Sequence, residues 1–128
     1  MRSVIASLLG VLMLVSAAFQ SYSGDPSLRI DTIVIDPGHG GIDAGATSNG
    51  VKEKDVVLSI ALKLGKYIKE NLEGVEVIYT RKTDKFVKLY KRAEIGNKNN
   101  ADVFISLHVN ASRATHIHGS ETFCMGVN

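Results

Sequence analysis

The stretch from Leu28 to Gly41, LRIDTIVIDPGHGG, decides the fold. Its first part, residues 28–36, holds the run Ile33-Val34-Ile35, and such a continuous β-branched run is typical of a short strand that is covered on both faces. Pro37 and the three glycines that follow end the strand and allow a tight turn. The stretch therefore predicts a buried strand that delivers its loop, with His39 in it, to one edge of a sheet.

Helical and strand patterns alternate after this strand. Apolar residues recur at steps of three and four over residues 53–72, which predicts an amphipathic helix that ends near Gly74. Residues 75–80 and 102–109 predict two further strands, residues 86–98 a second helix, and residues 120–125 a fourth strand. Strands separated by helices imply right-handed crossovers, so we expect an α/β fold, a mostly parallel sheet with helices on both faces.

Composition limits the possible classes of protein. The chain has 128 residues, 45% of them hydrophobic, which is enough for one domain and unlike a disordered chain. Its single cysteine, Cys124, excludes a disulfide framework and a cysteine zinc site, and we expect it to be a small apolar strand residue. Basic and acidic residues are interspersed, with a net charge of +2, so we expect no nucleic-acid partner and a monomer.

The first 23 residues have the pattern of an export signal. Arg2 precedes an apolar run over residues 4–18, and small and polar residues follow it. This order is typical of a secretory signal peptide, with cleavage after Ala18 or Ser23, although a permanent membrane anchor is an alternative. Residues 24–32 then form a short N-terminal segment, and we expect the mature protein to work outside the cytoplasm, in the periplasm or the extracellular space.

Three residues could form a metal site. His39 follows the first strand, Glu53 begins the first helix and His108 ends the third strand, so parallel strands bring them to one edge of the sheet. Two histidines and one glutamate are a ligand set of catalytic zinc sites. Each residue also has a structural explanation. Glu53 suits a helix N-terminus, and His108 could be a buried neutral histidine. The glycines around His39 could form a tight turn and nothing more.

Several motifs together resemble one protein family. They are VIDPGHGG at residues 34–41, Gly45-Ala46, Glu53-Lys54, Tyr79-Thr80-Arg81 with Asp84, residues 89–92, Ala101-Asp102 and SLHVN at residues 106–110. In order and spacing they are similar to the zinc-dependent N-acetylmuramoyl-L-alanine amidases of bacterial cell-wall metabolism, the amidase-3 family. The resemblance covers residues 33–123 and makes residues 33–128 the N-terminal part of an amidase catalytic domain.

This resemblance implies a function. The enzyme would cut the amide bond between N-acetylmuramic acid and the L-alanine of the peptidoglycan stem peptide, with a zinc-activated water. It implies that His39, Glu53 and His108 are the Zn²⁺ ligands, that peptidoglycan is the partner, and that the protein works at the cell wall. It names no regulatory protein partner for this chain. Two alternatives remain: a non-catalytic peptidoglycan-binding remnant, and a zinc peptidase that acts on the stem peptide.

The family's catalytic glutamate is placed beyond Asn128 by the same resemblance. We therefore expect no catalytic residue within this chain, and the activity of the chain by itself is in doubt. Glu121 follows His108, but the resemblance assigns it to a different strand. A late strand and a terminal helix would also be missing, so we expect the fold to be incomplete at the C-terminus and the chain to fold poorly alone.

Two residues next to the ligands are candidates for a supporting role. Asp36 could orient a ligand or the turn from the second shell of the metal, or could simply cap the strand end. Asn110 could contact the stem peptide or make a turn hydrogen bond.

The remaining polar candidates favour structural roles. His116 and His118 form a His-x-His pair that could bind metal on a strand, but their surroundings favour a solvated or substrate-contacting loop. Arg81, Asp84 and Arg92 match family positions, and we expect them to pair with one another rather than to bind substrate.

Overall fold

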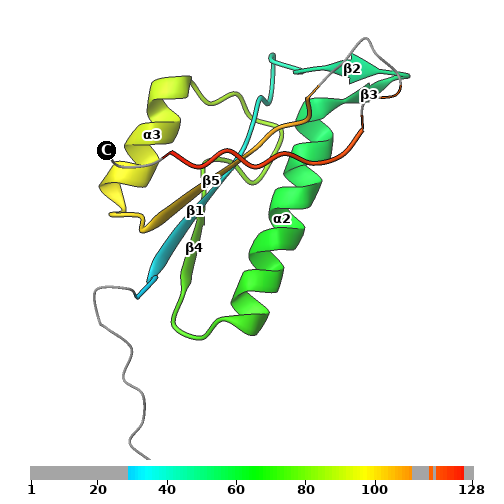
Figure 1. The fold of residues 1–128 in the computed structure, drawn as a ribbon. Coiled ribbons are helices and arrows are strands. Elements are labelled where there is room, and N and C mark those ends of the chain that lie inside the picture. The colour runs from blue at the N-terminus through cyan, green and yellow to red at the C-terminus, as the bar shows by residue number, and fades with distance from the viewer. Residues whose placement is uncertain (1–28, 111–115, 117, 126–128) are drawn as a thin grey trace, which may run out of the picture.

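The computed structural model describes residues 29–110, 116 and 118–125. Along the chain the elements are β1 (Thr32–Pro37), β2 (Thr47–Ser48), β3 (Val51–Lys52), α2 (Glu53–Asn71), β4 (Glu76–Tyr79), α3 (Leu89–Lys98) and β5 (Val103–Leu107) (Figure 1). The expected signal peptide lies outside the described residues. Within them, no helix is long and apolar enough to cross a membrane.

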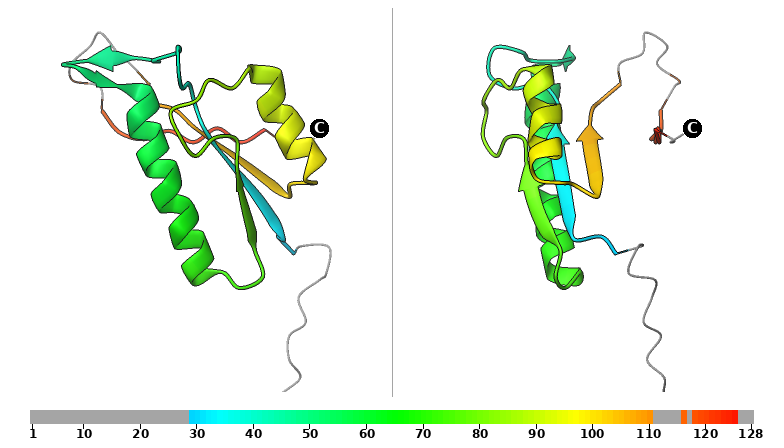
Figure 2. Two further views of the ribbon diagram at one scale, coloured as in Figure 1. Left: turned by 180° about the vertical axis from the view of Figure 1, so that it is seen from behind. Right: turned by 90° about the vertical axis from the view of Figure 1, so that its left-hand side faces the viewer.

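The main sheet has the strand order β4-β1-β5, and both pairings of β1 are parallel. The chain moves from β1 through α2 to β4 on one side, and then through α3 to β5 on the other side. Right-handed crossovers in opposite directions place their helices on opposite faces of the sheet. Figure 2 shows α2 and α3 on the two faces, which confirms the predicted α/β fold with a parallel sheet.

The face that α2 covers holds the main core. Ile33 and Ile35 of β1 pack with Val77 of β4 and with Ala61 and Ile68 of α2. Burial of a branched apolar side chain contributes about 1.5–3 kcal/mol, so the alternate residues of β1 account for much of the stability of this layer. The predicted helical periodicity between residues 53 and 72 thus corresponds to the buried stripe of α2.

The α3 face is less well covered. Val34 is buried there, but Phe104 of β5 remains 42% exposed although it lies against Gly96 of α3. The fourth strand predicted at residues 120–125 is wrong, because these residues are exposed and form no strand. A strand needs a partner for its backbone groups, and among the described residues β5 pairs only with β1. Cys124 is consequently exposed rather than an apolar strand residue.

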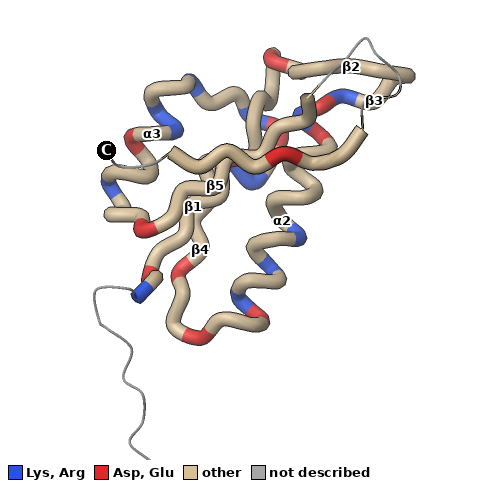
Figure 3. Tube along the Cα trace, in the orientation of Figure 1, with Lys and Arg blue, Asp and Glu red and all other residues tan. Residues whose placement is uncertain are grey.

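Two local features differ from the sequence prediction. The helix expected from residue 86 begins at Leu89, because Lys88 is extended. The hairpin β2–β3 is an additional feature, and its turn residues Asn49 and Gly50 have φ angles of 50° and 78°. Positive φ at both turn positions is the type I′ geometry that favours an Asn-Gly pair. Both helices, α2 and α3, carry interspersed charges of both signs (Figure 3).

Candidate metal centre

His39 lies in the loop after β1 and adopts the left-handed conformation, with φ of 58°. Reciprocal backbone hydrogen bonds between Gly40 and Asp43 close this loop, at 2.9 and 3.1 Å. The closure brings Oδ2 of Asp43 to 2.9 Å from Nδ1 of His39. This hydrogen bond and one from the backbone N–H of Gly45 lower the pKa of Asp43, so its ionised carboxylate accepts a hydrogen bond from the Nδ1–H of His39, and Nε2 faces Glu53.

Two buried guanidinium groups hold the backbone of the His39 loop. Arg81 donates to the carbonyl oxygens of Pro37 and Gly38, and Arg92 donates to those of Pro37 and His39, at 2.7–2.9 Å. Arg81 is 3% exposed and Arg92 is 6% exposed. Burial and the nearby charge of Arg92 lower the pKa of Arg81. Three successive carbonyl groups of the loop are thereby held by hydrogen bonds from buried side chains.

Asp36 contributes to this support rather than contacting a candidate ligand. Its buried carboxylate pairs with Arg92 at 2.7 Å and accepts hydrogen bonds from the hydroxyl groups of Thr80 and Ser106. Arg81, Asp84 and Arg92 were expected to pair with one another, and this prediction is wrong. Arg81 donates to a loop carbonyl, Asp84 accepts from Lys54, and Arg92 donates to Asp36. The loop carbonyls need hydrogen-bond donors, and the guanidinium groups supply them.

Glu53 is the first residue of α2, and its carboxylate is almost fully buried. Oε2 accepts the backbone N–H of Ala46 and Oε1 accepts that of Val109, both at 2.8 Å. Burial opposes the charge of Glu53, but the hydrogen bonds from these two amides outweigh it and lower the pKa of Glu53. The site therefore contains a buried carboxylate that stays ionised at neutral pH.

His108 follows β5 and reaches the same carboxylate from the opposite side. Its Nδ1 lies 3.1 Å from Oε1 of Glu53, and its side chain is 51% exposed. The ring occupies space that exists only because residue 38 is glycine: a Cβ atom there would lie 2.7 Å from Nε2 and 2.8 Å from Nδ1 of His108. The loop after β1 and the end of β5 are thus packed together at the imidazole.

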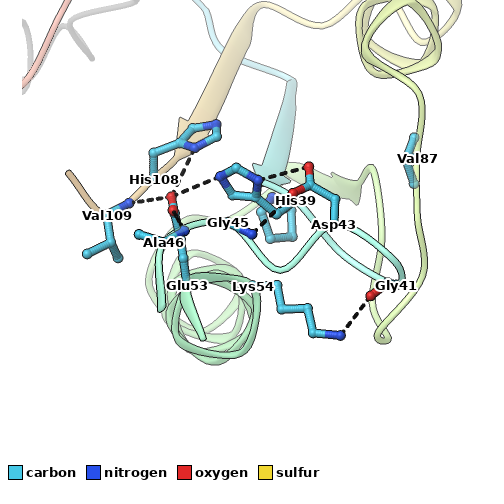
Figure 4. A network of polar contacts seen from close by, with 12 residues as sticks. His39, Gly41, Asp43, Gly45, Ala46, Glu53, Lys54, Val87, His108 and Val109 are labelled. Atoms are coloured by element: carbon cyan, nitrogen blue, oxygen red, sulfur yellow. Dashed lines mark hydrogen bonds and ion pairs between the residues drawn. The ribbon is translucent and has the colours of Figure 1, made fainter. Parts of the chain in front are cut away.

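The three residues converge as the sequence predicted. One ligand atom from each of His39, Glu53 and His108 lies within 4.8 Å of the others, and Figure 4 shows dashed lines from the carboxylate of Glu53 to both imidazoles. The imidazole nitrogens are 3.2 and 3.1 Å from Oε1 of Glu53. Two ligands of a tetrahedral zinc ion, each about 2.0–2.1 Å from it, lie about 3.3 Å apart, so the donor set and these two distances fit zinc.

The other predicted residues lie outside this group. Asn110 is exposed and donates to Glu121 at 3.3 Å. The ring of His118 lies 3.0 Å from the backbone carbonyl oxygen of His116, and neither residue belongs to the group among the described residues that could hold a metal ion.

Sequence reasoning missed residues that arrange the centre. Asp43 follows His39 by four residues in the same glycine-rich loop, and this spacing was the available signal. Lys54 donates to the carbonyl of Gly41 and to Asp84, at 2.8 and 2.6 Å, and Asp84 accepts the backbone N–H of Gly41. Nothing in the sequence identified Lys54 as a link between α2 and this loop.

Comparison with known proteins identifies the family. The family described as N-acetylmuramoyl-L-alanine amidase matches residues 33–127. The chain belongs to this family. The chain is similar to the sporulation-specific N-acetylmuramoyl-L-alanine amidase of Bacillus subtilis, with 46% identity over 83 residues, 65% of this chain and 32% of that protein.

Solved amidase structures share the fold. The catalytic domain of CwlV from Bacillus (Paenibacillus) polymyxa var. colistinus has a TM-score of 0.64 and 37% identity, over 69% of this chain and 50% of that one. The CwlD amidase of Clostridioides difficile, solved in complex with the GerS lipoprotein, has a TM-score of 0.63 and 36% identity, over 68% and 52%. The chain thus spans about a third of the curated relative and about half of these solved chains.

Proposed function

We propose that this chain contributes the metal-binding part of a zinc-dependent N-acetylmuramoyl-L-alanine amidase. Its reaction is hydrolysis of the amide bond between N-acetylmuramic acid and the L-alanine of the peptidoglycan stem peptide. The convergence of His39, Glu53 and His108 from three chain segments is the observation that carries the proposal. Family membership supports the choice of substrate.

The residues of the site prepare it for a cation before any cation binds. Asp43 holds the proton on Nδ1 of His39, so the lone pair of Nε2 faces Glu53. A carboxylate or carbonyl partner of this kind fixes the tautomer of a metal-ligating histidine. The amides of Ala46 and Val109 hold the carboxylate of Glu53 in its ionised form. His108, half exposed, leaves the site open to a substrate on one side.

Zinc is the metal that this donor set fits best, since two imidazoles and one carboxylate leave a fourth position for water or substrate. When bound, zinc would polarise the scissile carbonyl group and lower the pKa of water. The described residues bring two carboxylates to the site, and both are engaged: Asp43 with His39 and Gly45, Glu53 with two amides and both imidazoles.

This engagement favours a second candidate, a peptidoglycan-binding module that keeps the metal site without the hydrolysis. Amide hydrolysis needs a group that carries a proton to the departing nitrogen. Neither Asp43 nor Glu53 is free for that task in the described part of the chain.

Metal analysis tests the ligand set. We expect one zinc per chain in the purified 128-residue protein, and its loss in His39→Ala and His108→Ala. Lys63→Ala, on the exposed surface of α2, is the matched control and should retain zinc. Unchanged zinc content in both histidine variants would rule out the proposed ligands.

Digestion of purified peptidoglycan then distinguishes the candidate functions. Intact stem peptides with an L-alanine amino terminus indicate the amidase. Zinc-dependent retention on peptidoglycan without any released peptide indicates the binding module, and products cut only within the peptide indicate a zinc peptidase.

Export remains part of the proposal. The apolar run at residues 4–18 supports a signal peptide and a location in the periplasm or at the outer cell wall. Detection of the mature amino terminus in a secreted fraction, rather than in the cytoplasm, tests it.

A further inference from the structure

Lysine recurs at every third residue along the segment that leads from β4 into α3. The four are Lys82, Lys85, Lys88 and Lys91, and all of them are exposed. With Asp84 as the only acidic residue among residues 82–91, this stretch has a net charge of +3, against +2 for the whole chain. Figure 3 shows Lys and Arg along the connection into α3 and at the start of that helix. We call residues 82–91 the basic segment.

Most of this positive charge is not neutralised by neighbouring side chains. Asp84 forms its ion pair with Lys54 of α2, at 2.6 Å, and not with a lysine of the basic segment. Lys91 pairs with Glu94 at 2.7 Å. In the part of the chain that the structure describes, no ion pair involves the other three lysines, Lys82, Lys85 and Lys88. Three such ammonium groups on one short segment attract an anionic partner.

Large apolar side chains are exposed beside these lysines. Phe86 is 42% exposed and Tyr90 is 61% exposed, and two lysine ammonium groups lie 5.6 and 5.9 Å from the centre of the Tyr90 ring. Ile42 is 90% exposed and follows Gly41, where an added Cβ would lie only 2.7 Å from the backbone nitrogen of Phe86. Basic, aromatic and aliphatic groups thus share this surface.

The basic segment is fixed to the loop that carries His39. Asp84 accepts the backbone N–H of Gly41 at 2.6 Å. Gly40 has a φ angle of 121°, and an added Cβ there would clash with the carbonyl oxygen of Lys85, so glycine is needed for the two backbones to lie this close. The surface is therefore arranged before a partner binds, and little conformational entropy is lost on binding.

Two classes of anionic partner fit the lysines, a soluble polyanion and a bilayer surface. A soluble polyanion needs only positive charge, and it leaves the exposed Ile42, Phe86 and Tyr90 without a role. A bilayer with anionic head groups uses both features, since lysines attract the head groups while aromatic and aliphatic side chains enter the interface. The combination favours the bilayer.

We infer that the basic segment, together with Ile42, binds the surface of a bilayer that contains anionic phospholipids. Binding of this kind is peripheral and requires no membrane-spanning helix. It places the His39 loop next to the head groups, because this loop and the basic segment are in contact. The inference is independent of the proposed function, since nothing in it requires zinc or peptidoglycan.

Vesicle binding tests the inference with the 128-residue chain. The vesicles contain phosphatidylcholine alone, or phosphatidylcholine and phosphatidylglycerol in equal parts. The apolar run at residues 4–18 would bind either kind, so the measured quantity is the ratio of the two affinities in cosedimentation. Each unpaired lysine near an anionic surface contributes about fivefold, so we expect the wild type to favour the anionic vesicles about 100-fold. Equal affinities for the two kinds of vesicle would overturn the inference.

Two matched triple variants locate the interaction. One replaces three lysines of the basic segment, Lys82→Gln, Lys85→Gln and Lys88→Gln, and should lose the preference for anionic vesicles. The other removes the same charge with the same spacing from the exposed surface of α2, Lys63→Gln, Lys66→Gln and Lys69→Gln, and should retain it. All six side chains are exposed, so both variants should keep the far-UV circular dichroism of the wild type. Equal losses in the two variants would show an effect of total charge and reject the basic segment as the binding site.

The aromatic side chain separates a bilayer from a soluble polyanion. Tyr90→Ser should weaken binding to the anionic vesicles about fivefold, because the ring buries part of its apolar surface in the interface. Tyr67→Ser, at a tyrosine of α2 that is 65% exposed, is the control and should bind as the wild type does. Inorganic polyphosphate is the competing probe. A chain that binds polyphosphate as tightly as the anionic vesicles, with no effect of Tyr90→Ser on either, has a polyanion site, and the inference would be wrong.

Discussion

The substitution Gly38→Ala should weaken zinc binding and leave the stability of the fold almost unchanged. The backbone of Gly38 does not have positive φ, so alanine fits its conformation. The added Cβ, however, would lie 2.7 and 2.8 Å from the two ring nitrogens of His108. Nonbonded atoms of this kind pack at about 3.5–4.0 Å, so the ring must move by about 1 Å.

The displaced ring has somewhere to go, because the side chain of His108 is 51% exposed. We therefore expect a change of less than about 1 kcal/mol in the unfolding free energy, since alanine also restricts the unfolded chain. The zinc affinity should fall much more, because the side chains of a binding site must lie within about 0.5 Å of their productive positions. Changes around metal ligands cost about 10–100-fold in affinity, and we expect a loss at the upper end of that range.

Gly50→Ala provides the opposite control. Gly50 has φ of 78° with open space around its Cβ position, so alanine strains the turn without touching the metal centre. We expect a cost of about 1–2 kcal/mol in stability and no change in zinc affinity. The assays are thermal unfolding in the presence of a chelator and competition with a chromophoric zinc indicator. Gly38→Ala with wild-type zinc affinity would refute the assignment of His108 as a ligand.

Three further predictions concern the support of the site. Arg92→Leu leaves Asp36 buried without its cation and should lower the unfolding free energy by about 3–5 kcal/mol in urea, whereas a value below 1 kcal/mol would show that the pair is not structural. The hydrogen bond from Lys54, which has the largest effect, and that from the Gly41 amide lower the pKa of Asp84 from its ordinary value of 3.8. The ionised Asp84 therefore stabilises the folded protein above pH 3.8, and this stabilisation is lost as the pH falls through the folded pKa. Acid titrations of Asp84→Asn and the wild type should therefore converge at low pH, and a constant difference would contradict this. Chelation of zinc should lower the melting temperature yet leave the far-UV circular dichroism unchanged, because protein hydrogen bonds already hold the ligands; loss of the helical signal would show that the metal is needed for folding.

Much of the fold could be predicted because its signals are local. The β-branched run at residues 33–35 and the periodicity of residues 53–72 reflect burial within one element, and both correspond to observed elements. The strand expected at residues 120–125 depended on a partner strand, and pairing between distant segments leaves no local trace. The Asn49-Gly50 turn carries a local hairpin signal that does not appear in the hydrophobic periodicity.

The candidate ligands could be found for a similar reason. Each of them ends or begins an element, and parallel strands force such positions to one edge. The roles of Arg81 and Arg92 could not be found in this way. Their effect depends on which backbone carbonyls the turn leaves without partners, and that is settled only when the loop adopts its conformation.

This dependence explains why buried arginines lie next to a group of residues that could hold a cation. The His39 loop turns the carbonyls of Pro37, Gly38 and His39 inward, and unpaired buried carbonyls are costly. Guanidinium groups satisfy several of them at once, and Asp36 neutralises part of the added charge. The arginines donate to the backbone, while Asp43 and Glu53 keep negative charge beside the imidazoles. Positive charge thus lies at the carbonyl groups of the loop, and negative charge lies at the imidazoles, where it would favour a divalent cation.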